Sequence, residues 1–177
     1  MKKKYLVVGL GNPDKKFEYT RHNIGNLIIK QLILKTKTKL YLNNKFGSIY
    51  IIYNNYIKLI LLLSNFYMNN IGLSVKYFLK KYKLKSKNLI VLSDDIYIKF
   101  GKIKLKKNSG SGGHNGLKSI NNILKTKKYI KIKIGIGHDF KYGNQNKYVL
   151  NIMNKKELNY IYNNIYISIY NIILNLK

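Results

Sequence analysis

The chain has 177 residues, of which 34 are lysine or arginine and 6 are aspartate or glutamate, so its formal net charge at pH 7 is +28. This length favours one domain with a core that is stable without cross-links. The chain contains no cysteine, which excludes disulfides, thiolate metal sites and a cysteine nucleophile. Its apolar runs are too short for a membrane span or a secretion signal, so we expect a cytoplasmic protein with no membrane partner.

The strong positive charge predicts a polyanionic partner such as nucleic acid. A compositional bias offers a second explanation, because lysine, isoleucine, asparagine and tyrosine dominate the sequence and all have codons made only of A and T. We attribute part of the charge to this bias. Acidic residues, which such a bias removes, are therefore informative about function. They are Asp14, Glu18, Asp94, Asp95, Asp139 and Glu157.

Short apolar runs alternate with segments of helical periodicity along the chain. The apolar runs predict strands at residues 5–10, 46–53, 56–63, 89–92, 103–105 and 130–136. Apolar residues three and four apart predict helices from residue 23, over 71–82, over 117–124 and over 158–176. The Asn54-Asn55 pair predicts a hairpin turn, and the polar residues 140–157 predict a mobile loop or lid.

Strands interleaved with helices predict an α/β fold. We expect residues 1–177 to form a single catalytic domain, with a twisted mixed β-sheet flanked by helices. Asn12, Asn69 and Asp94 each follow the expected end of a strand. In open α/β sheets this edge binds ligands, so the three side chains indicate a site there.

Several familiar motifs are incomplete in this sequence. A dinucleotide-binding fingerprint begins at Gly9-Leu10-Gly11 but has Asp14 in place of its third glycine, and the glycine-rich residues 110–116 fail at Asn115. The three histidines are far apart and lack ligand partners at helical spacing, so we expect no metal. The Gly-x-Ser-x-Gly turn of serine hydrolases does not occur.

His22 and Asp94 are the candidates for acid–base chemistry. A carboxylate beside an imidazole fixes its tautomer and supports its positive charge while the ring takes a proton from water. Because no side-chain nucleophile is evident, attack by water on an ester is the simplest reaction. Asn12, Asn69 and Asn115 would orient the water and the substrate carbonyls. The open alternative is that His22 only packs at a helix start and Asp94 only caps a turn.

The chain resembles bacterial-type peptidyl-tRNA hydrolase over nearly its whole length. The order and spacing of several segments together carry the resemblance. These segments are Val8-Gly9-Leu10-Gly11-Asn12-Pro13, Thr20-Arg21-His22-Asn23-Ile24-Gly25, Tyr67-Met68-Asn69, Ser93-Asp94-Asp95, Gly112-Gly113-His114-Asn115-Gly116-Leu117-Lys118 and Ile134-Gly135-Ile136-Gly137-His138.

The resemblance implies an esterase that cuts the bond between a peptide and the 3′ ribose of tRNA, which recycles tRNA for translation. It implies that His22 is the general base, that Asp94 orients it, and that Asn12 places the substrate and the attacking water. No metal or organic cofactor is expected of this family, and we expect a monomer.

The same resemblance implies residues that bind the rest of the substrate. Met68 and Asn69 would form part of the peptide-binding cleft. His114 and Asn115 would belong to a glycine loop that gates the cleft and contacts the tRNA end. Phe17 would be a further substrate-binding residue, at a position that is usually tyrosine.

The chain departs from the family pattern at positions near the expected cleft. Asp14 stands where the family commonly has glycine, and Phe17 lacks the usual hydroxyl. Asp95 replaces the usual glutamate, and Tyr97 stands where the family has an acid. These changes leave His22 and Asp94 intact but bear on loop mobility and cleft polarity.

Lysines near the glycine loop and on the strand at 130–136 would hold the tRNA. Lys106 and Lys133 match basic positions of the family, and Lys107 is next to them in sequence, so we expect these residues to bind phosphates. Strand alternation places Lys131 on the same face as Lys133. The alternative for each lysine is a solvated surface position.

Two other functions compete with peptidyl-tRNA hydrolysis. The first is a non-catalytic RNA-binding protein on the same fold. The presence of Asp94 in a sequence poor in acids argues against it. The second is an α/β hydrolase for small esters, and the strong positive net charge argues against that function.

Overall fold

Seven strands form one twisted sheet in the computed structural model, which describes residues 3–53 and 56–176. The strand order is β2-β3-β4-β1-β5-β7-β6. The four central strands β4, β1, β5 and β7 are parallel, whereas β2 and β3 at one edge and β6 at the other are antiparallel to their neighbours. The strands are β1 Lys3–Gly9, β2 Leu40–Asn44, β3 Gly47–Tyr53, β4 Ile57–Ser64, β5 Leu89–Asp95, β6 Ile103–Lys107 and β7 Ile130–Gly135.

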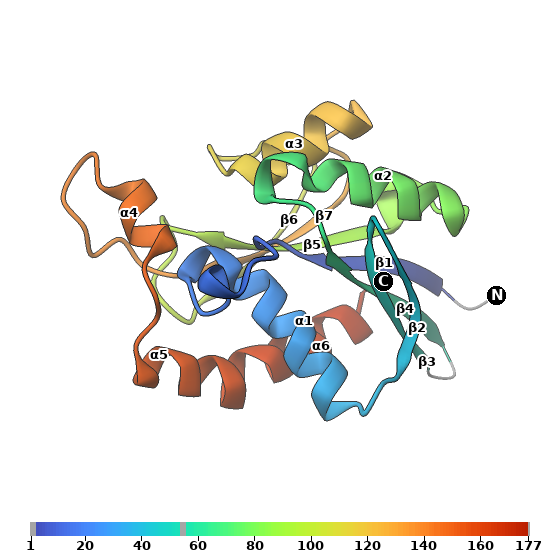
Figure 1. Cartoon of the computed structure of the whole chain (residues 1–177), viewed down its shortest axis with the longest axis horizontal. Helices are drawn as coiled ribbons and strands as arrows, with labels where there is room; N and C mark the ends of the chain where they lie inside the picture. The colour runs from blue at the N-terminus through green and yellow to red at the C-terminus, as the bar shows by residue number, and fades with distance from the viewer. Residues whose placement is uncertain (1–2, 54–55, 177) are drawn as a thin grey trace.

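Helices cover both faces of this sheet (Figure 1). They are α1 Ile24–Lys35, α2 Ile71–Lys81, α3 Asn115–Leu124, α4 Gln145–Leu150, α5 Lys155–Tyr160 and α6 Tyr166–Leu174. A π-helical turn, Ile161–Ile165, joins α5 to α6. Short 3-10 turns precede α1, α2 and β5, and a further one lies at Lys15–Phe17. In the described parts of the chain, no helix is long and apolar enough to cross a membrane.

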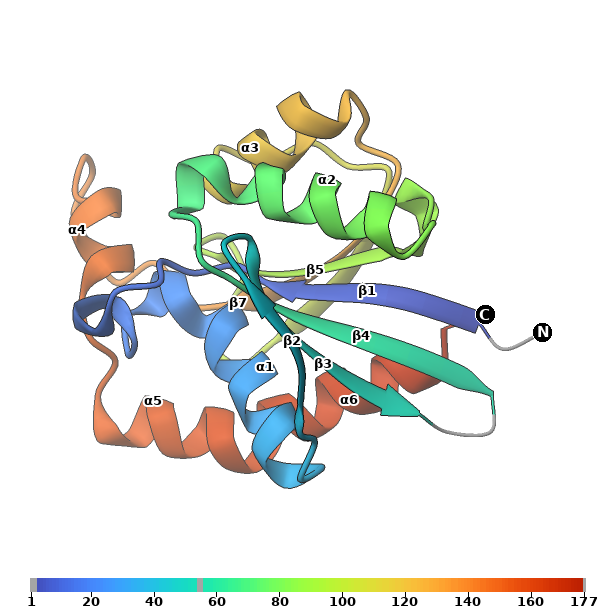
Figure 2. The ribbon, with the colours of Figure 1, turned by 45° about the vertical axis from the view of Figure 1, so that its right-hand side comes forward.

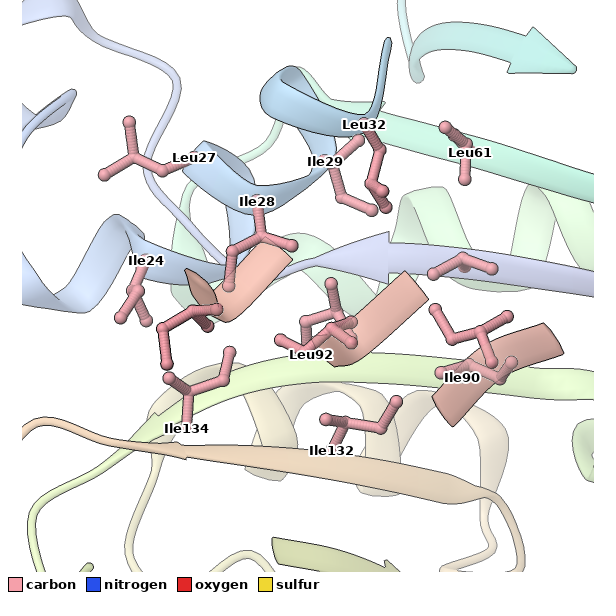
Figure 3. Packing of buried hydrophobic residues seen from close by; sticks show 14 of the residues in the cluster. Ile24, Leu27, Ile28, Ile29, Leu32, Leu61, Ile90, Leu92, Ile132 and Ile134 are labelled. Carbon is pink, nitrogen blue, oxygen red and sulfur yellow. The ribbon is translucent and has the colours of Figure 1, made fainter. Parts of the chain in front are cut away.

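The core has two layers, one on each face of the sheet. Helices α2 and α3 lie over one face, and α1 and α6 lie over the other (Figure 2). Figure 3 shows the α1 side, where Ile24, Ile28 and Leu32 pack toward Leu92 and Ile132 of the strands. Successive strand residues point to opposite faces, and helices cover both faces. Strands β1, β4 and β5 therefore carry unbroken apolar runs in which nearly every residue is buried.

A close approach between α1 and the sheet determines where the start of α1 lies. Gly25 is in the first turn of α1, and a Cβ atom there would lie 2.5 Å from the carbonyl oxygen of Leu92 and 2.6 Å from the nitrogen of Leu10. Only glycine fits this gap. The 3-10 turn Arg21–Asn23, which carries His22, is therefore held directly at the carboxyl ends of β1 and β5.

The structure confirms the predicted α/β class and nearly all the predicted strands and helices. Strand β2 was not expected, because it is mostly exposed and lacks an apolar alternation. Strand β5 runs through Asp94 to Asp95 instead of ending before them. The predicted turn at Asn54-Asn55 lies outside the described residues. Residues 140–157, expected as a loop, contain α4 and the start of α5.

Candidate active site

The carboxylate of Asp94 lies at the centre of a three-residue cluster. Its side chain is 4% exposed, at the end of β5. The Oδ1 atom lies 2.9 Å from Nδ1 of His22 and 2.9 Å from Nε2 of His114, and Oδ2 lies 3.0 Å from Nδ1 of His22. The two imidazole rings are themselves neighbours, with centroids 4.7 Å apart. One buried carboxylate therefore serves two histidines from distant parts of the chain.

The tautomer of His114 follows from its second hydrogen bond. His114 is the N-cap of α3, where its Nδ1 accepts a hydrogen bond of 3.1 Å from the backbone nitrogen of Gly116. An acceptor nitrogen carries no proton, so in neutral His114 the proton is on Nε2, which donates to Asp94. The helix cap thus leaves Nε2 as the nitrogen of His114 that donates to the carboxylate.

His22 takes the opposite arrangement. Its Nδ1 faces the carboxylate of Asp94, so it is the nitrogen that donates. The Nε2 atom of the neutral ring then carries a free lone pair. His22 lines both cavities at this end of the sheet, and its side chain is 12% exposed. A ring so oriented can accept a proton from a water in the cavity.

Opposing effects act on the pKa of Asp94. Burial raises it, whereas the charge and hydrogen bonds of His114 and His22 lower it more strongly. The net result holds the pKa well below its ordinary value of 3.8. Asp94 is consequently ionised at neutral pH and stabilises a positive charge on either imidazole.

Asn12 is fixed by a network that includes its neighbour in space, Asn23. The carboxamide of Asn23, which is 2% exposed, accepts from the backbone nitrogen of Asn12 at 2.8 Å and donates to its carbonyl oxygen at 2.9 Å. The Asn12 side-chain oxygen accepts a hydrogen bond of 2.9 Å from the nitrogen of Met68. Asn12 therefore ties the loop after β1 to the turn before α2.

Two cavities meet at His22. One, of about 340 Å³, is lined by Asn12, Met68, Asn69 and Asn115, together with residues of α4. The other, of about 390 Å³, is lined by Asp94, the glycine loop with His114, and Lys133. Asn115, the first residue of α3, lies on both. The site predicted at the strand ends is thus a continuous polar cleft around the His22–Asp94 pair.

Some predicted residues lie away from this cleft. Phe17 lines neither cavity beside His22, and its ring lies under the ammonium of Lys16. Lys106 and Lys107 are exposed on the edge strand β6. Lys133 is at the cleft but contacts a carboxylate oxygen of Asp95 at 2.7 Å.

Lys131 shares its sheet face with Lys133, as alternation predicts, but it is fully buried. Its ammonium lies 3.7 Å from the centroid of the Tyr129 ring and donates to the carbonyl oxygen of Lys127. Burial, with the charges of Lys133 and Lys127, lowers its pKa to about 8. Lys131 is therefore a packed side chain and not an exposed phosphate ligand.

Sequence reasoning missed the wall that α4 adds to the cleft. Asn146, Val149 and Leu150 line the smaller cavity with Tyr67. Their spacing of three and four residues is helical and could have been found within the polar segment.

Tyr67 also donates a hydrogen bond of 2.5 Å to Asp14, the residue that departs from the family pattern.

The His22, Asp94 and His114 cluster also has the composition of a metal site. One potential ligand atom from each residue lies within 4.8 Å of the others. The contacts of 2.9 Å have hydrogen-bond length, whereas two ligands of a tetrahedral zinc ion would be roughly 3.3 Å apart. The cluster as it stands is hydrogen-bonded, and the expectation of a metal-free site stays a prediction.

Replacing Asp94 by asparagine should reveal its contribution to stability. Because the folded-state pKa is depressed, the carboxylate stabilises the fold above pH 3.8, and this contribution is lost as the pH falls through the folded-state pKa. We expect Asp94→Asn to lower the free energy of unfolding near neutral pH by about 1.5–3 kcal/mol, with the difference shrinking in acid. Urea denaturation across this pH range measures it.

Ser93→Ala is the matched control, because the neighbouring Ser93 is also buried and its hydroxyl finds no hydrogen-bond partner within residues 3–53 and 56–176. Its effect on unfolding should not vary with pH. A difference between Asp94→Asn and the parent that stays constant into acid would contradict the assignment.

Comparisons with known proteins identify the family of this chain. A family model described as peptidyl-tRNA hydrolase matches residues 6–174. Peptidyl-tRNA hydrolase of Azobacteroides pseudotrichonymphae is 41% identical over 154 residues, covering 87% of this chain and 82% of the relative, and that of Ureaplasma urealyticum is 45% identical over 139 residues, covering 77% and 73%. The crystal structure of peptidyl-tRNA hydrolase from Acinetobacter baumannii superposes with a TM-score of 0.80 at 29% identity, covering 100% of this chain and 97% of that one. These matches confirm the resemblance carried by the short motifs, and the chain belongs to the peptidyl-tRNA hydrolase family.

Proposed function

We propose that His22 is the general base in the hydrolysis of peptidyl-tRNA by this protein. The contact of 2.9 Å between His22 Nδ1 and the ionised, buried Asp94 carries the proposal. It leaves the second ring nitrogen free to take a proton at the cavity. A non-catalytic RNA-binding role is not favoured by the family match.

The reaction needs one proton relay and no covalent intermediate on the protein. His22 Nε2 takes a proton from water as the water oxygen attacks the carbonyl carbon of the ester. The tetrahedral intermediate then collapses, the bond to the ribose 3′ oxygen breaks, and the imidazolium returns the proton to that oxygen. The Asp94 carboxylate stabilises the imidazolium between these steps.

The asparagines of the cleft provide the polar groups that this reaction needs. We assign Asn12 to placing the water and the ester, because two hydrogen bonds to the side chain of Asn23 hold its backbone in place. Asn69 and Asn115 are exposed at the cavity and can donate to the carbonyl oxygen and the peptide amides. Met68, which is 4% exposed, gives the cavity an apolar floor for a peptide side chain. We assign Phe17 only a peripheral part in substrate binding.

We assign the tRNA phosphates to the lysines beside the glycine loop. Lys106 and Lys107 are exposed on the edge strand β6, which pairs with β7, and Lys133 of β7 lines the cleft where Asp95 orients its ammonium. Each contact to phosphate releases counterions and steepens the salt dependence of binding.

We further infer that the protein works as a monomer in the cytoplasm. One chain supplies every residue of the cleft described above, and translation supplies the substrate there. Light scattering should give the mass of one chain, and a stable dimer would contradict the inference.

Replacing the proposed base should abolish turnover but not binding. A positioned general base contributes about 10²–10⁴-fold, so His22→Ala should lose at least about 10²-fold in kcat. Its affinity for deacylated tRNA should stay unchanged, because the lysines assigned to the phosphates are all retained. Single-turnover cleavage of peptidyl-tRNA and a tRNA binding titration measure the two quantities.

His138→Ala is the control, because His138 is exposed and lines neither cavity beside His22. It should cleave at the parent rate. Normal cleavage by His22→Ala would remove His22 from its role, and RNA binding without cleavage by the parent would favour the non-catalytic alternative.

The phosphate assignment predicts a change in salt dependence. Lys106→Gln and Lys107→Gln should each lower the slope of log affinity against log salt by about 0.7–0.9 for a lost phosphate contact. Lys35→Gln, at the end of α1 far from the cleft, is the control for a general charge effect. Equal changes in slope in all three variants would mean that the charge acts without a defined tRNA path.

A further inference from the structure

Arg21 is the only arginine among 34 basic residues, and it directly precedes His22. Its side chain lines neither cavity beside His22. It instead forms a fork on Glu157, with Nη2 at 3.0 and 3.1 Å from the two carboxylate oxygens and Nε at 3.2 Å from Oε1. The side chains of this pair are 13% and 14% exposed. A mostly buried bidentate pair of this kind requires arginine, because lysine lacks the planar fork.

The guanidinium of Arg21 also holds α4. It lies 4.5 Å from the centroid of the Tyr148 ring, and the Tyr148 hydroxyl donates a hydrogen bond of 2.6 Å to the carbonyl oxygen of Ile136, just beyond β7. The backbone nitrogen of Arg21 donates to the carbonyl oxygen of Asn151 at 3.2 Å. One residue thus contacts the middle of α4, the chain directly after it and the first turn of α5.

Neighbouring backbone contacts extend this attachment. Thr20 and Ile152 form an antiparallel bridge, and the nitrogen of Met153 donates to the carbonyl oxygen of Tyr19 at 2.9 Å. Glu157 has a second task, because its Oε2 accepts from the nitrogen of Asn154 in the capping box of α5. The segment before His22 and the segment after α4 therefore run together, with Arg21 and Glu157 at their junction.

Helix α4 needs such support. It has 6 residues, which is too short for an isolated helix to be stable in water. It stands at one end of the molecule, beyond the carboxyl ends of the parallel strands (Figures 1 and 2). Its Tyr148 contacts Arg21, whereas Asn146, Val149 and Leu150 line the cavity with His22.

We propose that Arg21 is a positioning residue that fixes α4 as the wall of the peptide-binding cavity. The cavity combines apolar side chains from Met68, Val149 and Leu150 with asparagine amides, which suits the alternating side chains and amides of a peptide. Arg21 itself touches neither the peptide nor the tRNA. This inference rests on the proposed function of the cleft, and it assigns the peptide to the face of α4 that lines the cavity with Met68.

Arg21→Lys and Glu157→Gln test the proposal from both sides of the ion pair. Arg21→Lys keeps the charge but loses the fork and the flat stacking surface. Glu157→Gln keeps an acceptor for the cap of α5 but loses the charge. Each should lower kcat/KM for peptidyl-tRNA by up to about 10²-fold, mainly through KM, with affinity for deacylated tRNA unchanged. The double variant should be no worse than the poorer single variant, because both break one contact.

Amide hydrogen exchange provides a readout that does not depend on activity. Exchange at residues 145–150 should become faster in both variants, while exchange in β1 and β5 stays at the parent rate. Lys30→Gln is the matched control, since it breaks an ion pair with Glu18 whose side chains are 46% and 25% exposed and line neither cavity beside His22. It should change neither KM nor exchange in α4.

Several results would overturn the proposal. One is that both variants keep the parent KM and the parent exchange rate in α4. Additive losses in the double variant, or faster exchange throughout the core, would also contradict it. An effect of Arg21→Lys that Glu157→Gln does not share would mean that Arg21 contacts the substrate directly. None of them depends on His22, whose replacement in the same assay tests the general-base role separately.

Discussion

The geometry of the candidate active site depends on one buried negative charge, the carboxylate of Asp94. Asp94 would be costly to bury alone, and the two imidazoles that contact it offset that cost. The histidines are not equivalent, because the cap of α3 engages Nδ1 of His114 and leaves only its Nε2 to donate. His22 donates through Nδ1, so its other nitrogen remains available. This difference leaves Nε2 of His22, and not a nitrogen of His114, available to accept a proton at the cavity.

The fold brings these groups together by allowing very close packing at the strand ends. Gly25 lets α1 approach the backbone of Leu10 and Leu92, which carries His22 to the end of β5. The buried Asn23 next to it fixes Asn12 through two hydrogen bonds. His22, Asp94 and Asn12 therefore come from three segments whose relative positions depend on a close backbone approach and on one buried carboxamide.

Much of this was predictable from the sequence, because strong apolar alternation and strand-end polar residues are local signals. The strand at Ile130–Gly135 belongs to this class, and so does the place of Asp94 at the end of β5. The pairing of Asp94 with His22 was a hypothesis from the chemistry of the two side chains, and the contact of 2.9 Å confirms it. The contact of His114 with the same carboxylate was not predictable, because it depends on how α3 is capped. The Arg21–Glu157 pair joins residues 136 positions apart, and no local sequence pattern predicts such a contact. Helix α4 was missed because its polar composition hides its helical spacing.

The most direct test of this account is the protonation state of each histidine nitrogen in solution. Nitrogen-15 NMR of the imidazole rings near neutral pH should show His22 with its proton on Nδ1 and a bare Nε2, and His114 with the reverse. This result is required if Asp94 orients a base toward the cleft. A His22 ring protonated on Nε2 and bare at Nδ1 would leave no proton for the Asp94 contact and no acceptor for water, and it would contradict the mechanism.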